Sequence, residues 1–125
     1  MLNSPRSSLP LSEHGAIWLA NLNPGKGSEP GKTRPVLVVQ SQTLLDAGHP
    51  STLVIPLTTN LVDDAEPLRV RVTPFARLKH DSDLLIDQLR AIDNRRLTSG
   101  PLGVCSPALM RKVQKAIVEV LDLTG

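Results

Sequence analysis

Two polar side chains in this sequence stand where apolar segments meet loops, and their chemistry suits a phosphate group. Arg34 precedes Pro35, which biases the backbone of Arg34 to an extended conformation at the start of a β-branched run. A guanidinium binds two phosphate oxygens in a fork and stays charged at any relevant pH. Thr58 ends another apolar run, and its hydroxyl is able to donate a hydrogen bond to phosphate. The residues alone leave a second reading open, because most arginines at strand starts are solvated or ion-paired and threonine is a good strand residue.

Basic residues gather near Arg34. Lys26 and Lys32 lie in the glycine-rich segment before it, and Arg69 and Arg71 alternate with apolar residues further along the chain. The formal net charge is +2 and the pI is near 9.0, which permits an anionic partner without requiring one. On charge alone, an ordinary, slightly basic surface is the better explanation. Aromatic residues make up 2% of the chain, so a nucleic-acid contact would depend on basic side chains and the backbone rather than on base stacking.

Metal, disulfide and membrane functions are not expected. Cys105 is the single cysteine, and His14, His49 and His80 are too far apart in the sequence for a metal-ligand motif. We therefore predict no metal and no cofactor. No apolar run approaches the roughly 20 residues of a membrane span, and the N-terminal segment lacks the apolar core of a signal peptide. These features predict a cytoplasmic protein whose residues 1–12 form a disordered extension.

The apolar pattern predicts short strands separated by loops. Residues 68–72 alternate between apolar and basic, which is typical of a strand with one face of each kind. Pro56 has no backbone N–H, so its end of the third strand should lie at a sheet edge or a bulge. Asp93 is expected to cap a short turn through Leu97, and the glycine-rich residues 22–33 to form a long, functional loop. The expected strands are 16–21, 34–40, 53–57, 68–72 and 84–89, the last continuing toward residue 92.

One helix is expected at the end of the chain. Ser106 is a good N-cap and Pro107 suits the first helical position. From Leu109 to Leu121, apolar residues recur at helical spacing. Short strands without long helical crossovers, followed by this helix, predict a mainly β fold: a small barrel with a helix packed on it, formed by a single domain over residues 13–125.

Three segments, in this order and at this spacing, resemble the MazF/PemK toxins. The likeness runs from about Gly15 to the C-terminal helix, which is most of the chain. No single segment is decisive, and their combination makes the resemblance specific. The segments are residues 15–24 with Gly27-Ser28-Glu29 and residues 32–40, then Val54-Ile55-Pro56-Leu57-Thr58, and finally Asp81-Ser82 with residues 87–93 and Arg96-Leu97.

The resemblance implies an SH3-like barrel of the CcdB/PemK kind that forms a homodimer. It also implies an endoribonuclease that cuts single-stranded mRNA at short sequences without a metal and is neutralised by a small MazE-like antitoxin. The family's catalytic arginine and threonine correspond to Arg34 and Thr58, and its loop Ser-Glu pair corresponds to Ser28 and Glu29. The chain departs from the family at Pro30, where relatives commonly have glutamine.

Metal-free RNA cleavage uses the substrate's own 2′-hydroxyl as nucleophile, leaving a 2′,3′-cyclic phosphate and a 5′-hydroxyl. The expected role of Arg34 and Thr58 is to stabilise charge on the phosphate, and Glu29 is the candidate general base. Residues 87–90 recur in the family, and a buried charged pair stabilising the barrel or dimer explains them as well as RNA contact does. The candidate RNA contacts are Ser28, Lys26, Lys32 and Gln88.

Two other function classes stay open at this stage. A CcdB-like gyrase poison shares the expected fold but does not need the Ser-Glu pair before Arg34-Pro35. A non-catalytic SH3-like binding module needs none of these residues. Incubation of the protein with long RNA in EDTA, together with a test for stalled DNA gyrase, separates the three classes. Discrete cuts favour the nuclease, intact RNA with stalled gyrase favours the poison, and neither result favours the binding module.

Overall fold

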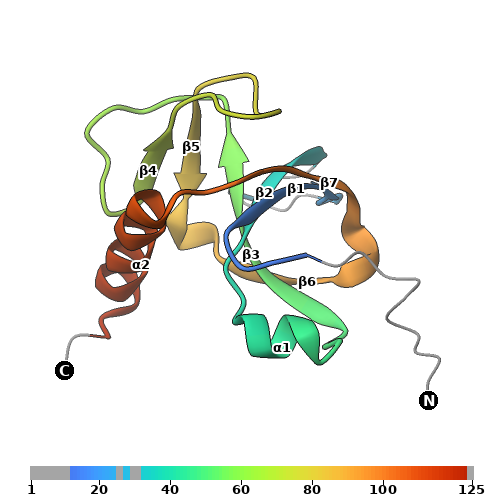
Figure 1. Cartoon of the computed structure of the whole chain (residues 1–125). Helices are drawn as coiled ribbons and strands as arrows, with labels where there is room; N and C mark the ends of the chain where they lie inside the picture. Colours follow the sequence, from blue (N-terminus) through green and yellow to red (C-terminus); the bar gives the residue numbers. More distant parts are fainter. Residues whose placement is uncertain (1–11, 25–26, 29–31, 124–125) are drawn as a thin grey trace, which may run out of the picture.

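The computed structural model describes residues 12–24, 27–28 and 32–123 of the 125-residue chain. The expected extension over residues 1–12 lies outside the described residues, apart from Ser12. The elements are β1 (Ala16–Asn21), β2 (Thr33–Val38), α1 (Gln42–Asp46), β3 (Ser51–Thr58), β4 (Arg69–Val72), β5 (Ser82–Leu85), the 3-10 turn η2 (Ile86–Gln88), β6 (Arg90–Asp93), the 3-10 turn η3 (Asn94–Arg96), β7 (Leu97–Val104) and α2 (Pro107–Leu121) (Figure 1).

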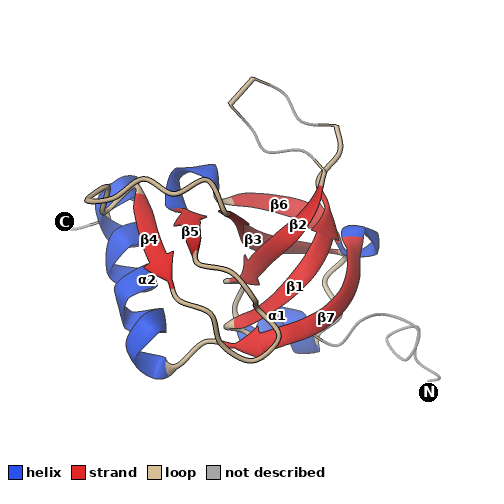
Figure 2. Cartoon of the chain, turned by 90° about the horizontal axis from the view of Figure 1, so that it is seen from above, coloured by secondary structure: helices blue, strands red, loops and turns tan. Residues whose placement is uncertain are grey.

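The seven strands of the described residues form one antiparallel, curled sheet. Its order is β4-β5-β3-β2-β1-β7, and β6 pairs with the first half of β3. The mainly β fold with a C-terminal helix is therefore confirmed. The sheet does not close into a barrel by strand pairing, because β4 and β7 are its two edges. The loop after β4 bridges them in part, since the Arg77 amide donates to the Leu102 carbonyl over 2.8 Å. Viewed from above, α2 flanks β4 and β5 while β1 and β7 lie on the other side (Figure 2).

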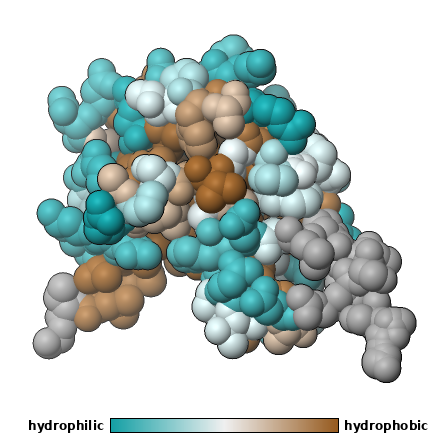
Figure 3. All heavy atoms as spheres, viewed as in Figure 1, coloured by the Kyte–Doolittle hydropathy of each residue, from teal (hydrophilic) through white to brown (hydrophobic). Residues whose placement is uncertain are grey.

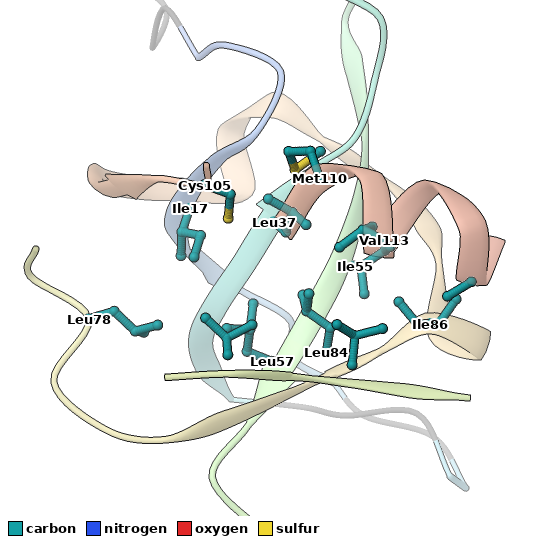
Figure 4. Packing of buried hydrophobic residues seen from close by; sticks show 13 residues of the cluster. Ile17, Leu37, Ile55, Leu57, Leu78, Leu84, Ile86, Cys105, Met110 and Val113 are labelled. Carbon is teal, nitrogen blue, oxygen red and sulfur yellow. The ribbon is translucent and has the colours of Figure 1, made fainter. Parts of the chain in front are cut away.

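Alternate residues of β1, β2 and β3 pack into two different hydrophobic clusters, as the two-residue period of a strand requires. The first cluster lies between the sheet and α2, where side chains from both point toward one another (Figure 4). Its members from the strands include Ile17, Leu37 and Ile55. The second cluster lies on the opposite strand face and includes Trp18, Val36, Val38 and Val54. Trp18 is thus a core residue, as expected, with 8% of its surface exposed.

The bounds expected for the first four strands are confirmed within two residues, and those of β1 agree at both ends. The placement of Pro56 at an edge or bulge is wrong, because β3 is a central strand. Val39 donates to the Leu53 carbonyl, so the Val36–Pro56 pair is a non-hydrogen-bonded one and the proline nitrogen faces away from β2. On that side β3 pairs with β6 only up to Val54 and with β5 only from Leu57, and Pro56 occupies the gap.

The expectation of one strand over residues 84–89 is wrong. The segment divides into β5, the turn η2 and β6. Both strands pair with β3, at its opposite ends, and β5 also pairs with β4. The chain has to bend between these two pairings, and η2 provides the bend. The predicted turn after Asp93 is confirmed, since its side chain accepts from the Arg95 amide over 2.9 Å.

Strand β7 was not predicted, because Gly100-Pro101-Leu102-Gly103 has the composition of a loop. It pairs with β1 at a register that shifts at two points. Its glycines are there for close approach: a Cβ on Gly100 would lie 2.5 Å from Cδ2 of Trp18, and one on Gly103 would lie 2.7 Å from Cε2 of Phe75. Gly100 and Gly103, which made this segment read as a loop, are thus the residues that allow β7 to pack against Trp18 and Phe75.

Helix α2 begins as predicted, with the Ser106 hydroxyl accepting from the Leu109 amide over 3.1 Å and Pro107 in the first turn. Met110, Val113 and Ala116 are its buried residues. Leu121, expected on the apolar face, is 49% exposed. Figure 3 shows apolar atoms at this end of α2, where Leu123 is also exposed. Among the described residues, neither helix has the length and the apolar composition that a membrane-spanning helix requires.

Candidate active site

Arg34 and Thr58 are brought together in one pocket, as the sequence predicted. Val36 and Pro56 are partners in the β2–β3 pairing, and continuing that register two residues further sets Arg34 across from Thr58. Both side chains therefore lie on the strand face of the second hydrophobic cluster, beyond its end. The pocket has a volume of about 280 Å³ and is lined by Thr33, Arg34, Pro35, Leu57, Thr58, Thr59 and Ser82.

The Arg34 guanidinium is half-buried at the start of β2. Its Nη1 lies 3.5 Å from the carbonyl oxygen of Leu57, across the strand pair. That contact holds the guanidinium near the end of β3, and Arg34 is one of the residues that line the pocket. A planar, permanently charged group held in this way is suited to a phosphate that enters the pocket.

The Thr58 hydroxyl oxygen accepts a hydrogen bond from the Asn60 amide over 3.1 Å. This bond uses a lone pair of the hydroxyl and leaves its hydrogen for another acceptor. Thr58 is half-buried, so an incoming phosphate oxygen can reach it. The pocket thus combines one charged and one neutral donor.

The loop that precedes β2 is clamped at its base. The Leu22 amide donates to the Lys32 carbonyl over 2.8 Å, and the Lys32 amide donates to Oδ1 of Asn23 over 2.6 Å. Arg96 adds two bonds from Nη1, to the carbonyls of Asn21 and Asn23, at 3.0 and 2.6 Å. Arg96 was noted in the sequence only as part of the family pattern, and its role at the loop base was missed.

The described residues include only two of the four candidate site residues in that loop, Ser28 and Lys32. Lys32 is exposed next to the Arg34 pocket and adopts a left-handed backbone with φ of 66°. Ser28 is exposed. Lys26 and Glu29 lie outside the described residues, so the expectations for them stay predictions.

Gln88 is not among the residues that line the Arg34 pocket. It is half-buried at the end of η2, between β5 and β6. The buried charged pair considered for residues 87–90 is absent within the described part of the chain, where Asp87 is exposed and neither it nor Arg90 forms an ion pair. The described residues of one chain therefore hold no buried partner for Asp87, and a charged pair at a dimer interface stays a prediction.

The buried carboxylate of this region is Asp83, which the sequence analysis missed. It is 1% exposed and lies opposite Thr58 on β5. Arg71 Nε contacts its Oδ1 at 2.5 Å, while Arg69 Nη1 and the Val62 amide contact its Oδ2 at 3.1 and 2.9 Å. Burial alone would raise the pKa of Asp83, but the hydrogen bonds from Arg71, Val62 and Arg69 bring it below its ordinary value.

Arg69 and Arg71 do share one strand face, as predicted, but their charge is compensated. Both pair with Asp83, and Arg71 also pairs with Asp63 at 2.8 Å. The hydrogen bonds that Arg71 donates to Asp83 and Asp63 raise the pKa of its guanidinium above the ordinary value. The basic strip of Arg69 and Arg71 therefore presents less positive charge than the sequence implied.

A larger cavity, of about 660 Å³, is a weaker candidate for an anionic substrate. Its walls carry acidic side chains, which repel phosphate. No group of three or more histidine, cysteine or acidic side chains in the described ranges is placed to hold a metal ion. The cavity is lined by Val62, Asp63, Asp64, Ala65, Glu66, Arg71 and Asp83.

Several solved structures share this fold. An endoribonuclease in complex with its cognate antitoxin from a mycobacterial species has a TM-score of 0.72 and 21% identity, over 91% of this chain and 98% of the other. MazF from Deinococcus radiodurans has a TM-score of 0.75 and 20% identity, over 90% and 98%. The Mycobacterium tuberculosis toxin MazF-mt6 has a TM-score of 0.70 and 21% identity, over 86% and 96%.

These likenesses establish the fold, and a sequence comparison establishes the family. A family model for the PemK-like, MazF-like toxin of type II toxin–antitoxin systems matches residues 13–121, which include β1 to α2. The resemblance seen in the three sequence segments is thereby confirmed: the chain belongs to the PemK-like, MazF-like toxins of type II toxin–antitoxin systems.

Proposed function

We propose that this toxin is an endoribonuclease that cleaves single-stranded mRNA without a metal ion. The observation that carries the proposal is the shared pocket of Arg34 and Thr58, which sets a guanidinium and a hydroxyl around a space able to hold one phosphate. Family membership and the endoribonuclease named among the solved structures of the same fold support it.

In the proposed reaction, the 2′-hydroxyl oxygen attacks the adjacent phosphorus and the bond to the 5′-oxygen breaks. The products are a 2′,3′-cyclic phosphate and a 5′-hydroxyl end. Negative charge grows on the non-bridging phosphate oxygens as the new bond forms. Arg34 stabilises that charge in a fork, and the Thr58 hydroxyl donates to it, because both donors are already held by their strands.

Two protons also have to move. The 2′-hydroxyl loses one, and we assign its acceptance to Glu29, which lies outside the described residues. The leaving 5′-oxygen gains the other. Arg34 is a poor source for it, because an unperturbed guanidinium has a pKa above about 12, so water is assigned this role. Ser28, Lys26, Lys32 and Gln88 remain the proposed contacts to the RNA strand.

We further propose that the toxin works as a homodimer and is neutralised by a MazE-like antitoxin. Support comes from the toxin–antitoxin family and from the complex of a similar endoribonuclease with its cognate antitoxin. An acidic, hydrophobic antitoxin tail would be attracted to Lys32 and Arg34 and would cover the pocket.

The test is to incubate the purified protein with a long defined RNA in EDTA and to map the new ends. Discrete cuts with cyclic phosphate and 5′-hydroxyl ends are expected. Recovery of 5′-phosphate ends would contradict 2′-hydroxyl attack and indicate a metal-activated water. Intact RNA combined with stalled DNA gyrase would favour a CcdB-like poison instead.

A further inference from the structure

We propose that Arg69 and Asp83 are positioning residues for Thr58, acting through the backbone of Asn60. The inference rests on the proposed function, because it assigns these two residues to the same cleavage site. Neither side chain lines the Arg34 pocket. They lie under the loop that leaves Thr58 and fix the part of it that holds the Thr58 hydroxyl.

The connection is a chain of hydrogen bonds. Asp83 Oδ2 accepts from Arg69 Nη1 over 3.1 Å, and the same Nη1 donates to the Asn60 carbonyl over 2.8 Å. The Asn60 amide then donates to the Thr58 hydroxyl over 3.1 Å. Asn60 is therefore held through its carbonyl by Arg69 while its amide orients the catalytic hydroxyl.

A second bond fastens the same loop. The Val62 amide donates to Asp83 Oδ2 over 2.9 Å, two residues after Asn60. Asp83 itself cannot shift easily, because it is 1% exposed and its charge is held by Arg71 as well as by Arg69. A buried carboxylate with several charged partners is a rigid anchor. Residues 60–62 are thus fixed at two points to one immobile group.

The arrangement has a consequence for catalysis. The hydroxyl rotor of a threonine turns to suit its partners. The Asn60 amide occupies one lone pair and directs the remaining hydrogen elsewhere. If the loop loosens, the hydroxyl loses its fixed direction, and the donor stops being preorganised for the phosphate.

A direct phosphate contact is the competing role for Arg69. The Arg69 side chain is 23% exposed, and its guanidinium is already bonded to Asp83 and to the Asn60 carbonyl, which favours positioning. The two roles predict different kinetics. Loss of a phosphate contact raises KM and reduces the salt dependence, whereas loss of positioning lowers kcat and acts only when Thr58 is present.

The experiment is a double-mutant cycle of Arg69→Ala and Thr58→Ala, with RNA cleavage as the readout. Arg69→Ala leaves Arg71 to compensate Asp83, so the fold should persist. We expect kcat to fall about tenfold, the scale of one lost hydrogen bond, with KM unchanged. In the Thr58→Ala background Arg69→Ala should have no further effect. The control Asp63→Asn removes only an exposed partner of Arg71 and should leave kcat unchanged.

Amide hydrogen exchange by NMR provides a readout that does not depend on cleavage. In Arg69→Ala the Asn60 amide should exchange faster, while the Val39 amide, bonded to Leu53 in the sheet, should keep its protection. Unchanged protection at Asn60, or additive losses of kcat in the double variant, would overturn the positioning role. If Thr58→Ala cleaves like the wild type, the proposed site fails, and the exchange data still decide whether Arg69 holds Asn60.

Discussion

Thr58 and Asp83 lie directly opposite each other on β3 and β5, on the strand face away from Leu57 and Leu84. Arg71 is the next residue across, opposite Asp83 on β4. One row of polar side chains therefore crosses three strands, from the pocket to a buried ion-pair cluster. The Thr58 hydroxyl, to which the proposed function assigns a catalytic role, belongs to the same row as Asp83, the most buried charged side chain of the described residues.

Arg34→Ala should lower the cleavage rate by at least about 10², the scale of losing one preorganised charge-stabilising donor. The fold should be unaffected, because the side chain is only half-buried and outside both hydrophobic clusters. Single-turnover cleavage of a short RNA, together with a thermal unfolding curve, measures both effects. Arg111→Ala, which removes an exposed charge from α2, is the matched control. A near-normal rate for the Arg34 variant would place the chemistry elsewhere.

Thr58→Ala should slow cleavage less than Arg34→Ala does, by about tenfold, because a neutral hydroxyl forms a weaker hydrogen bond than a guanidinium. Thr58→Ser keeps the hydroxyl and should recover most of the rate. The same single-turnover assay compares the cleavage rates of Arg34→Ala, Thr58→Ala and Thr58→Ser. Equal losses for serine and alanine would mean that the threonine methyl group, and not the hydroxyl, is what the site needs.

Asp83→Asn should reduce the free energy of unfolding at pH 7 by about 2–3 kcal/mol. This is below the roughly 3–5 kcal/mol for breaking a fully buried pair, because Arg69 and Arg71 keep partial access to water. The pKa of Asp83 is lowered in the folded chain from 3.8. Its stabilisation is therefore complete above that pH and is lost as the pH falls through the folded-state pKa.

Urea unfolding of the wild type and of Asp83→Asn from pH 7 to pH 3 measures this dependence. The difference in free energy of unfolding between the wild type and Asp83→Asn should become smaller below about pH 4, because only the wild type carries the titrating carboxyl at this position. A gap that stays constant to pH 3 would show that Asp83 does not gain its stabilising effect from its charge.

Gly100→Ala should destabilise the fold by about 1–3 kcal/mol, the usual cost of overpacking a core. The new Cβ would lie 2.5 and 2.7 Å from Cδ2 and Cγ of Trp18, which is itself packed in the second cluster. Ser99→Ala, at the exposed neighbouring position of β7, should cost little. Thermal denaturation of both variants tests the close approach of β7 to β1.

The antitoxin and an uncleavable RNA should compete for the toxin. Association of either should slow as salt rises, and Lys32→Ala should reduce the association rate by about threefold at low salt. Lys115→Ala, on the exposed side of α2, is the control for a lost charge. The measurement is the displacement of labelled RNA from the toxin as antitoxin is added, and competition predicts that the RNA is released. Binding of both to one dimer without mutual weakening would mean that inhibition works through a change in the loops instead.

The sequence predicted β1 and α2 because each rests on a local pattern, an apolar run and a capped helix. The shared pocket of Arg34 and Thr58 was expected from the family resemblance and not from the residues alone. Strand β7 was missed because its glycines are required by close contacts with Trp18 and Phe75, and these residues are distant in sequence. Asp83 was missed for the same reason. Its burial depends on Arg69 and Arg71 of β4, and nothing in the sequence around Asp83 indicates that pairing.

The clamp of Asn23, Lys32 and Arg96 has an evolutionary consequence. It seals the β1–β2 connection before the segment between Pro24 and Lys32 begins. The residues that form these hydrogen bonds lie outside that segment, and a change in its length adds only a small, logarithmic entropy cost. Under the proposed function, Glu29 is the position in the segment that has to be kept, while an insertion beside it should leave the clamp in place.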